Sequence, residues 1–437
     1  MSMIRLAFIA ALAFALPAKA EIAIQDVTSP GGIKAWLIED HGIPFTALEI
    51  RFKGGTALDP EGKRGAVNLM TALIEEGTGT LNAQAFAEAR DALAAEFSFG
   101  ASTDAVSVSA RMLTENRDMA VQLLRQALVA PRFDVAAIER VRGQVVANIQ
   151  SDAQDPDTIA ARSFDAAAFG AHPYGAAGDG TEDSVAGLTR DDLLAAHQGA
   201  LARDRIYVSA AGDISAAELG VLVDDLLGGL PATGAPLPAR ADWLLPGGAT
   251  VVSFPSPQSV VRFGHAGIKR DDPDFFAAFI LNEILGGGRF TARLMTEVRD
   301  KRGLTYGISS YLAALDQAEM VLGQFSTANA TAGEAIDLVR VEWAKMAAEG
   351  VTNEELAATK TYLTGAYPLR FNGNGPIARI LVGMQMDDLP IDYVTTRNAR
   401  IEAVTLDDVR RVAARLLQPE NLHFVVVGQP EGVTATR

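Results

Sequence analysis

Apolar residues recur at intervals of three and four positions in the stretch GKRGAVNLMTALIEEGT, residues 62–78. The apolar positions are Ala66, Leu69, Met70, Leu73 and Ile74. The other face carries Asn68, Thr71, Ala72 and Glu75 at the same spacing. This spacing predicts an amphipathic helix that is entered through a glycine turn, packs one face on a core and ends at Gly77.

A second pattern occurs twice in the chain. The segments LTRDDLLAAHQGALARDRIYVSAAGD (residues 188–213) and VTLDDVRRVAARLLQPENLHFVVVGQ (residues 404–429) each combine a threonine, two aspartates, an amphipathic helical stretch and an apolar strand. The threonine and the closing glycine are 23 positions apart in both, from Thr189 to Gly212 and from Thr405 to Gly428. Helix capping explains Thr-x-Asp-Asp locally. The matched spacing predicts an internal duplication.

The beginnings of the two halves also correspond. The segments TALEIRFKGG (residues 46–55) and SVVRFGHAG (residues 259–267) alternate apolar residues, as strands do. Each is followed by the pattern of two helices, two strands and long helices. We therefore predict an α+β fold made of two homologous domains, residues 21–230 and 250–437. A proline-rich segment without periodicity, residues 231–249, is expected to be an extended linker between them.

The first twenty residues have the plan of a secretory signal peptide. Arg5 precedes the apolar run LAFIAALAFALP, which ends in Ala18-Lys19-Ala20. A buried N-terminal helix is the alternative, but it explains neither the Ala-x-Ala end nor the abrupt change at Glu21. We expect residues 1–20 to be cleaved and the mature chain to be exported to the periplasm, without membrane insertion.

Composition narrows the possible functions. The chain has 437 residues and no cysteine, so neither disulfides nor zinc sites of the cysteine type can form. Its net charge is −16, and removal of the leader takes away two positive charges and no acid. That balance argues against nucleic acid and against anionic membrane surfaces as partners. It is compatible with peptides.

Few residues are candidates for chemistry. The sequence has no G-x-S-x-G elbow. No two of its five histidines have the spacing of a helical metal pair: His41, His172, His197, His265 and His423. The glycine-rich LGGGRF (residues 285–290) follows a helical pattern, so we expect it to end a helix rather than to bind phosphate. From composition and spacing alone, the chain has no visible catalytic machinery.

The helix of residues 62–78 has the spacing of a zinc site but not its residues. An H-x-x-E-H helix would place its two histidines and its glutamate where this chain has Asn68, Ala72 and Thr71, respectively. The surrounding GGTALDPEGKRGAVNLMTALIEEGT (residues 54–78) resembles the frame of that helix in the pitrilysin/insulinase family of zinc peptidases, which includes mitochondrial processing peptidase. The resemblance implies that the residues flanking the helix are those of the family, whereas the zinc site itself has been lost.

The resemblance covers nearly the whole chain after the leader. The family's third zinc ligand, a glutamate, would fall at Ala147 or Asn148, and neither carries a carboxylate. AFGAHPYG (residues 168–175) is similar to the family's His-Pro-Tyr-Gly segment, which makes His172 a structural residue. The most specific match is LNEILGGGRFTARLMTEVRDKRGLTYGISSYL (residues 281–312). The resemblance implies two α/β domains with mostly antiparallel sheets packed against helices, and no cofactor in this chain.

In that family, the second half contributes an arginine and a tyrosine seven positions apart, just before and within a strand. They match Arg299 and Tyr306. The resemblance implies that Arg299 binds the substrate's main chain and that the Tyr306 hydroxyl helps to stabilise the tetrahedral oxyanion. Both residues are also ordinary structural choices near a helix end and a strand start.

The paired-subunit branch of the family divides the site between two chains. The resemblance therefore implies a zinc-free subunit that is inactive alone, with a zinc-bearing homologous peptidase subunit as its partner and peptide as substrate. A scaffold or peptide-binding protein of the same fold is the alternative. An autonomous zinc peptidase is disfavoured because the ligands and the base are missing.

Overall fold

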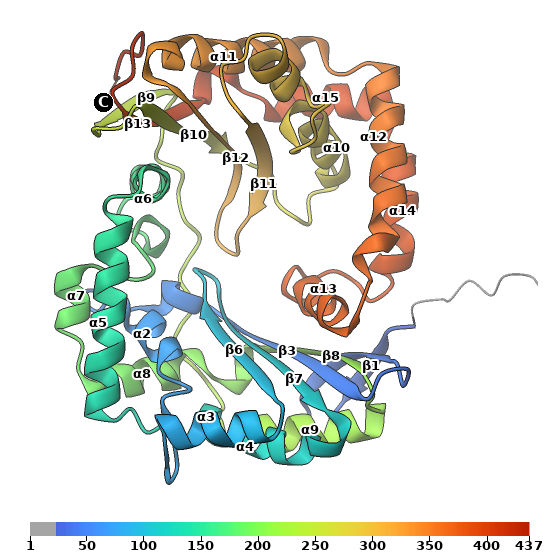
Figure 1. Cartoon of the computed structure of the whole chain (residues 1–437). Helices are drawn as coiled ribbons and strands as arrows, with labels where there is room; N and C mark the ends of the chain where they lie inside the picture. Colours follow the sequence, from blue (N-terminus) through green and yellow to red (C-terminus); the bar gives the residue numbers. More distant parts are fainter. Residues whose placement is uncertain (1–22, 437) are drawn as a thin grey trace, which may run out of the picture.

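Two β-sheets, one in each half of the chain, form the framework of the protein (Figure 1). The computed structural model describes residues 23–436, so the predicted signal peptide, residues 1–20, lies outside the described residues. Both sheets are mostly antiparallel and are packed against helices. The predicted α+β class is confirmed.

The first sheet has six strands in the order β1-β2-β8-β3-β7-β6. The strands are β1 (Gln25–Thr28), β2 (Lys34–Glu39), β3 (Phe45–Lys53), β6 (Glu96–Ala101), β7 (Ala105–Leu113) and β8 (Ile206–Gly212). Neighbours are antiparallel except for β2 and β8. The strand predicted at residues 46–55 is β3, which pairs with β7 along its whole length. A short hairpin of β4 (Gly77–Thr78) and β5 (Leu81–Asn82) lies outside this sheet.

The second sheet has five strands in the order β11-β12-β10-β13-β9. The strands are β9 (Gly248–Ser253), β10 (Gln258–Ala266), β11 (Ile308–Ala314), β12 (Glu319–Ala328) and β13 (His423–Gly428). Only the β13–β9 pair is parallel. The predicted strand at residues 259–267 is β10, the central strand. The two halves therefore repeat one plan, as the duplicated sequence pattern predicts.

Helices cover both sheets. Those of the first half are α2 (Ala66–Ala72), α3 (Ala83–Ala92), α4 (Arg117–Val129), α5 (Val135–Asp152), α6 (Pro156–Phe169), α7 (Glu182–Ala186), α8 (Arg190–Ala200) and α9 (Ala216–Leu227). Those of the second half are α10 (Phe275–Gly286), α11 (Ala332–Glu349), α12 (Asn353–Ala366), α13 (Asn374–Met386), α14 (Tyr393–Ala403) and α15 (Leu406–Leu416), with a π-helical turn at Met295–Asp300. Within residues 23–436, no helix is long and apolar enough to cross a membrane.

The repeated threonine-aspartate pattern forms the same structure in both halves. In α8, the Thr189 hydroxyl accepts a hydrogen bond from the Asp192 main chain, and the Asp192 carboxylate accepts one from the Thr189 main chain. Thr405 and Asp408 do the same at the start of α15. Each pair is a capping box, which satisfies donors that a helix N-terminus would otherwise leave free. The predicted N-caps are confirmed.

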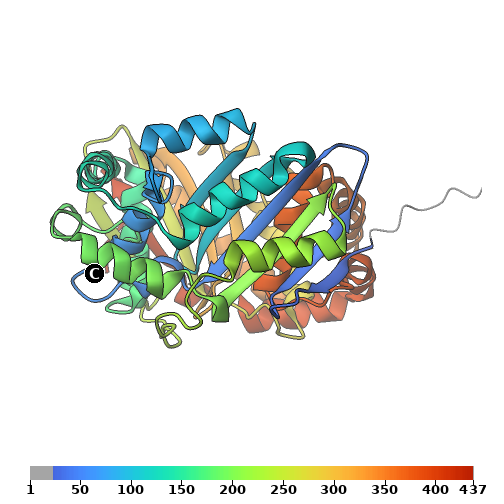
Figure 2. The ribbon, with the colours of Figure 1, turned by 90° about the horizontal axis from the view of Figure 1, so that it is seen from below.

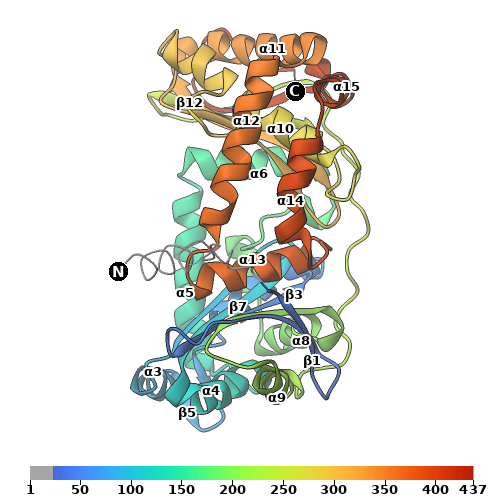
Figure 3. The same ribbon diagram turned by 90° about the vertical axis from the view of Figure 1, so that its right-hand side faces the viewer.

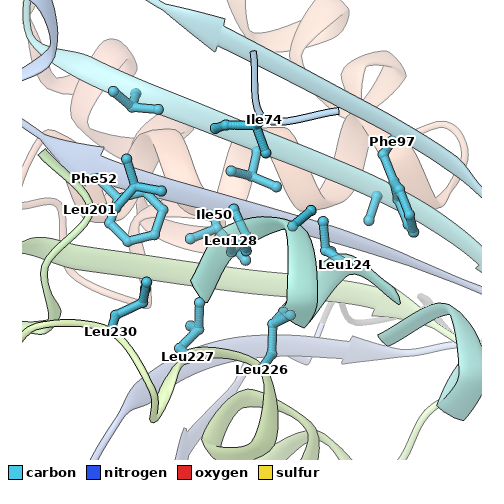
Figure 4. Close-up of a cluster of buried hydrophobic side chains, with 14 of the residues drawn as sticks. Ile50, Phe52, Ile74, Phe97, Leu124, Leu128, Leu201, Leu226, Leu227 and Leu230 are labelled. Atoms are coloured by element: carbon cyan, nitrogen blue, oxygen red, sulfur yellow. The ribbon is translucent and has the colours of Figure 1, made fainter. Parts of the chain in front are cut away.

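The core of the first half lies between its sheet and the helices on the outer side. Figure 2 shows these blue, teal and green helices from below, lying across the strands. Phe52 of β3 is fully buried there, against leucines of α4 and α9 (Figure 4). The leucines include Leu124, Leu128, Leu226 and Leu227. Burial of such side chains contributes roughly 1.5–3 kcal/mol each, so this cluster fixes the sheet to its outer helices.

The inner faces of the two sheets are covered by exchanged helices. α6 of the first half packs on β10 and β13 of the second sheet, and α13 of the second half packs on β8 and β3 of the first (Figure 1). The Ser209 hydroxyl of β8 donates to the Ala378 carbonyl of α13 over 2.7 Å, and the Gln385 amide of α13 donates to the Val208 carbonyl of β8 over 2.8 Å. Each half therefore completes the other.

The segment between the halves is extended but fixed. Residues 231–247 contain no helix or strand. The Leu244 main chain donates to the Ala168 carbonyl of the first half, and the Ala241 main chain donates to the Gln317 carbonyl of the second. The Trp243 ring packs against the Phe164 ring of α6, with 5.9 Å between centroids. The linker therefore packs against both halves.

The helix predicted over residues 62–78 is shorter than expected. It begins after Gly65 but ends at Ala72 rather than at Gly77. The chain then tightens into turns in which each main-chain amide bonds three residues back, such as Ile74 to Thr71. These turns keep Leu73 and Ile74 fully buried before the chain enters β4.

Candidate functional site

The start of α2 is held by a buried carboxylate. Asp59 accepts hydrogen bonds from the main-chain amides of Gly65, over 2.7 Å, and Val67, over 2.8 Å. Gly65 has φ of 90°, a conformation that glycine adopts without strain. Burial raises the pKa of Asp59 to about 6, against the opposing effect of these amides. The frame of the helix is thus intact.

The residues at the zinc positions do not fit a zinc ion. Ala72 has no donor atom and is exposed, and the Thr71 hydroxyl is buried and donates to the Val67 carbonyl over 2.8 Å. On α5, Ala147 and Asn148 offer no carboxylate and lie exposed. Zinc in proteins takes imidazole, thiolate or carboxylate ligands, and only the neutral amides of Asn68 and Asn148 stand at these positions. Nowhere in residues 23–436 do three or more histidine or acidic side chains gather in a metal-binding group.

The histidines have structural partners. His172 accepts a hydrogen bond from the Tyr174 main chain at Nδ1 and donates from Nε2 to the Ala239 carbonyl of the linker, over 2.9 Å. His197 bonds the Leu128 carbonyl, and His265 accepts from the Trp343 indole over 3.1 Å. Burial lowers the pKa of both His197 and His265, which favours their neutral forms. His172 thus ties the first half to the linker, in agreement with its predicted structural role.

The structure brings Arg299 and Tyr306 together. Arg299 lies in the π-helical turn, and its Nε donates to the Tyr306 carbonyl over 3.1 Å. Its Nη1 donates to Asp300 over 2.7 Å, and its guanidinium lies 4.9 Å from the centroid of the Phe290 ring. The Tyr306 side chain is 92% exposed, although tyrosine normally buries most of its ring. The phenol therefore projects into solvent from a backbone that Arg299 holds.

The neighbouring Thr305 fixes the same segment to the sheet. Its hydroxyl lies 2.7 Å from the Ser326 carbonyl of β12 and 3.1 Å from the Gly307 amide. Tyr306 lines a pocket of about 470 Å³ together with Gly288, and Asp157 of α6 from the first half lines it too. The phenol thus stands at an open pocket between the two halves, not on a flat surface.

One detail of the prediction is wrong. Tyr306 does not lie within a strand: β11 begins two residues later, at Ile308, which is the first residue to pair with Phe325 of β12. The Thr305 hydroxyl engages the Gly307 amide, so the backbone turns before it can join the ladder. The turn leaves the Tyr306 side chain free of the packing that a strand position would impose.

Sequence reasoning missed a group of arginines in the second half. Arg270, Arg370 and Arg397 line a cavity with Tyr393, although they come from three separate segments. Tertiary structure alone brings them together. The sequence carries no local signal for this group, because its members lie far apart in the chain.

Comparison with known families agrees with this architecture. A family model described as insulinase (peptidase family M16) matches residues 34–181, and one described as the peptidase M16 inactive domain matches residues 187–363. The chain belongs to the M16 family. Together the two matches span most of both halves, so the predicted pitrilysin/insulinase resemblance is confirmed.

Relatives within the M16 family cover nearly the whole chain. The "non-peptidase homolog YmxG" of Helicobacter pylori is 24% identical over 89% of this chain and 90% of its own length. An "uncharacterized zinc protease" of Mycobacterium tuberculosis is 27% identical over 91% of this chain and 92% of its own. A crystal structure of a peptidase M16 inactive domain from Pseudomonas fluorescens superposes with a TM-score of 0.88, at 27% identity, over 95% of this chain and 100% of that one.

Proposed function

We propose that this chain is the zinc-free subunit of an exported, two-chain M16 metallopeptidase, and that it completes the active site of a zinc-bearing partner. The observation that carries the proposal is the exposed Tyr306 phenol on an anchored backbone beside Arg299. This pair is present in a chain whose zinc positions carry no zinc ligand. The signal-peptide plan of residues 1–20 supports a periplasmic location.

The geometry suits a role in holding peptide. Within the described part of the chain, Nη2 of Arg299 has no hydrogen-bond partner, while Nε and Nη1 are occupied. A guanidinium fixed in this way can donate to a substrate carbonyl without first losing much conformational freedom. The Tyr306 hydroxyl can donate to the oxygen that gains negative charge when the peptide carbonyl is attacked.

The remaining chemistry belongs to the proposed partner. A zinc-bearing M16 subunit would supply the metal, the activated water and the general base. The residues of this chain would orient the peptide and stabilise charge, and Asn68, Thr71 and Ala72 would not touch the reaction. Alone, the chain is expected to be inactive.

A peptide-binding or scaffold protein is the second candidate. The name "non-peptidase homolog" of the Helicobacter pylori relative favours it. In that case Arg299 and Tyr306 would remain for packing only. The high exposure of the Tyr306 ring speaks for the first candidate, because a packing role requires a buried ring.

Reconstitution tests the proposal. The mature chain would be assayed on a quenched peptide mixture alone and together with an exported M16 homologue that has an intact H-x-x-E-H motif. We expect activity only in the mixture. Tyr306→Phe should lower kcat by about 10²-fold, because removal of one oxyanion donor typically has an effect of that size. Arg299→Ala should chiefly raise KM.

Matched variants separate chemistry from folding. Tyr362→Phe removes the hydroxyl of another exposed tyrosine, and Arg302→Ala removes a neighbouring arginine; both should leave the rate unchanged. Complex formation would be measured by analytical ultracentrifugation, and zinc content by atomic absorption. If the zinc-bearing homologue cleaves equally fast without this chain, the scaffold candidate is correct. Activity and stoichiometric zinc in the lone chain would refute both candidates.

A further inference from the structure

Two neighbouring cavities in the second half share a set of arginines. The cavities, of about 550 and 450 Å³, are both lined by Arg270, Arg370, Arg397 and Tyr393. They lie where α10, α13 and α14 meet, beside the antiparallel pair of α12 and α14 (Figure 3). We call the space around these four residues the arginine pocket.

Arg397 is a buried cation without a carboxylate. The residue is 6% exposed, and its guanidinium donates to the Leu363 carbonyl and to the Asn398 side chain, each over 3.1 Å. Its charged carbon lies 4.2 Å from the centroid of the Tyr367 ring. Among residues 23–436, no acidic group lies at ion-pair distance from it. Burial lowers the pKa of Arg397, and nearby Arg370 lowers it further.

Of the other two arginines, Arg270 has an acidic partner and Arg370 does not. Arg270 is satisfied, since it donates to the Tyr393 hydroxyl over 2.9 Å and lies 3.7 Å from Asp387. Arg370 is exposed at the pocket, and the described residues give it no ion pair or hydrogen bond. Glu283 also lines the pocket, and burial raises its pKa. Among the described residues, neither Arg397 nor Arg370 has a carboxylate at ion-pair distance, although both line one space in a chain whose net charge is −16.

The arginine pocket is adjacent to the pocket at Tyr306. The smaller of its two cavities and the Tyr306 pocket share Gly288 and Ser309 as lining residues. Residues 309–312 of β11 line the smaller cavity. Because a strand advances about 3.3 Å per residue, the four steps of β11 from Ile308, which lines the Tyr306 pocket, to Leu312, which lines the smaller cavity, span about 13 Å. A peptide that runs beside β11 would therefore pass from the Tyr306 pocket to the cavity lined by the arginines within about four residues.

We infer that the arginine pocket binds a carboxylate of the peptide substrate, about four residues from the main chain that Arg299 and Tyr306 hold. This inference rests on the proposed function. A carboxylate can accept two parallel hydrogen bonds from one guanidinium, and such charge-assisted pairs are strong when partly buried. Its source is either the peptide's C-terminus or an acidic side chain at that position.

Calorimetry on the mature chain alone tests the inference. Three acetylated peptides of about eight residues, enough to span the ~13 Å, would share one neutral sequence. The first ends in a free carboxylate, the second in an amide, and the third in an amide with a glutamate at the fourth position from the end. We expect the free carboxylate to bind about tenfold more tightly than the plain amide. The glutamate peptide shows whether a side-chain carboxylate serves equally.

Arginine variants locate the effect. Arg370→Gln should reduce the tenfold preference to about twofold or less, and this exposed residue makes no contact that folding needs. Arg397→Gln should do the same where the variant folds, as checked by circular dichroism. Arg400→Gln is the matched control: it lies on the same helix, α14, is exposed and lines another cavity, so it should keep the preference.

The outcomes separate this inference from the proposed function. Equal affinity for carboxylate and amide peptides overturns the inference, and so does a preference that survives both Arg370→Gln and Arg397→Gln. The binding experiment needs no partner and no cleavage. A carboxylate preference in a chain that fails to activate any zinc-bearing homologue would therefore confirm the pocket and refute only the split active site.

Discussion

At the scale of single residues, Asp59 determines how the helix with the lost zinc site begins. Its carboxylate is buried, yet it accepts bonds from two main-chain amides of the first turn of α2. The amides favour the charged form, while burial favours the neutral form and has the larger effect, so the pKa is raised to about 6. The protonation state of Asp59 therefore changes near pH 6.

The sign of its effect on stability follows from that direction. A raised pKa in the folded state means that the protonated form folds more favourably, so stability is fully present below the unfolded pKa of about 3.9 and is lost as pH rises through about 6. We predict that the free energy of unfolding of the wild type, relative to Asp59→Asn, falls by about 1–3 kcal/mol between pH 4 and 7. Urea unfolding at both pH values measures this difference.

The other carboxylates are common to both proteins, so their contributions cancel in the comparison. An unchanged difference between pH 4 and 7 would mean that the bonds from Gly65 and Val67 offset burial completely. A difference that grows with pH would mean that they outweigh it.

The sequence shows some residues of the site and hides others. The lack of zinc ligands at Asn68, Thr71 and Ala72 is visible in the sequence, because a methyl group cannot coordinate zinc whatever surrounds it. The positions of Arg270 and Arg397 are not visible. Their partners, Tyr393 and the Leu363 carbonyl, lie 123 and 34 positions away in the chain, and no local spacing encodes such contacts.

At the scale of elements, the two capping boxes fix where α8 and α15 begin. Thr405 and Asp408 satisfy each other's main-chain amides. The Thr405 hydroxyl and the Thr405 amide both donate to the Asp408 carboxylate, and they hold the pKa of Asp408 below its usual range. α15 packs on α10 and α11, so a frayed first turn would loosen three helices together. The capping box of residues 405–408 thus supports the packing of α15 on α10 and α11.

We predict that Thr405→Ala lowers the free energy of unfolding by about 1 kcal/mol, the typical effect of losing an N-cap oxygen. The shift of the urea midpoint, followed by circular dichroism, measures it. Thr80→Ala provides the comparison, because Thr80 is exposed and lies in a turn. A Thr405→Ala midpoint equal to that of Thr80→Ala would show that Asp408 caps the helix by itself.

The sequence predicts the helices and strands that have N-caps and apolar runs. It predicts less well where a helix ends. The spacing of Thr189 to Gly212 placed α8 and β8 correctly because caps and apolar runs act locally. α2 ended five residues early because burial of Leu73 and Ile74 competes with continued helix. Such competition depends on what packs above the helix, which the sequence of the helix does not contain.

At the scale of the whole molecule, small residues allow α13 to lie directly on the first sheet. Ala378 of α13 is fully buried against Ala47 of β3 and Ala211 of β8. The close approach lets the Ser209 hydroxyl reach the Ala378 carbonyl over 2.7 Å. The contact between α13 and the first sheet therefore depends on small side-chain volumes as well as on hydrogen bonds.

We predict that Ala378→Leu destabilises the protein by about 1–3 kcal/mol, because a buried contact between alanines has no room for a larger side chain. It should also increase proteolytic cleavage in the segments on either side of α13, since the helix would be displaced from the sheet. Thermal unfolding and limited proteolysis measure the two effects.

Ala358→Leu adds the same side chain at an exposed position of α12 and should change neither quantity. If Ala378→Leu behaved like Ala358→Leu, α13 would be able to shift on the sheet without cost. The sequence could not predict this contact, because Ala378 and Ala47 are more than three hundred positions apart and alanine occurs throughout the chain.

The exchange of α6 and α13 also bears on how such a chain could arise and be divided. α6 of the first half packs on the sheet of the second half, and α13 of the second half packs on the sheet of the first. Two identical copies of one half could exchange this helix across a two-fold axis and so form a domain-swapped homodimer. Fusion of two such copies into one chain would give the arrangement described here. A half expressed by itself is accordingly expected to pair with a second copy rather than to stay monomeric.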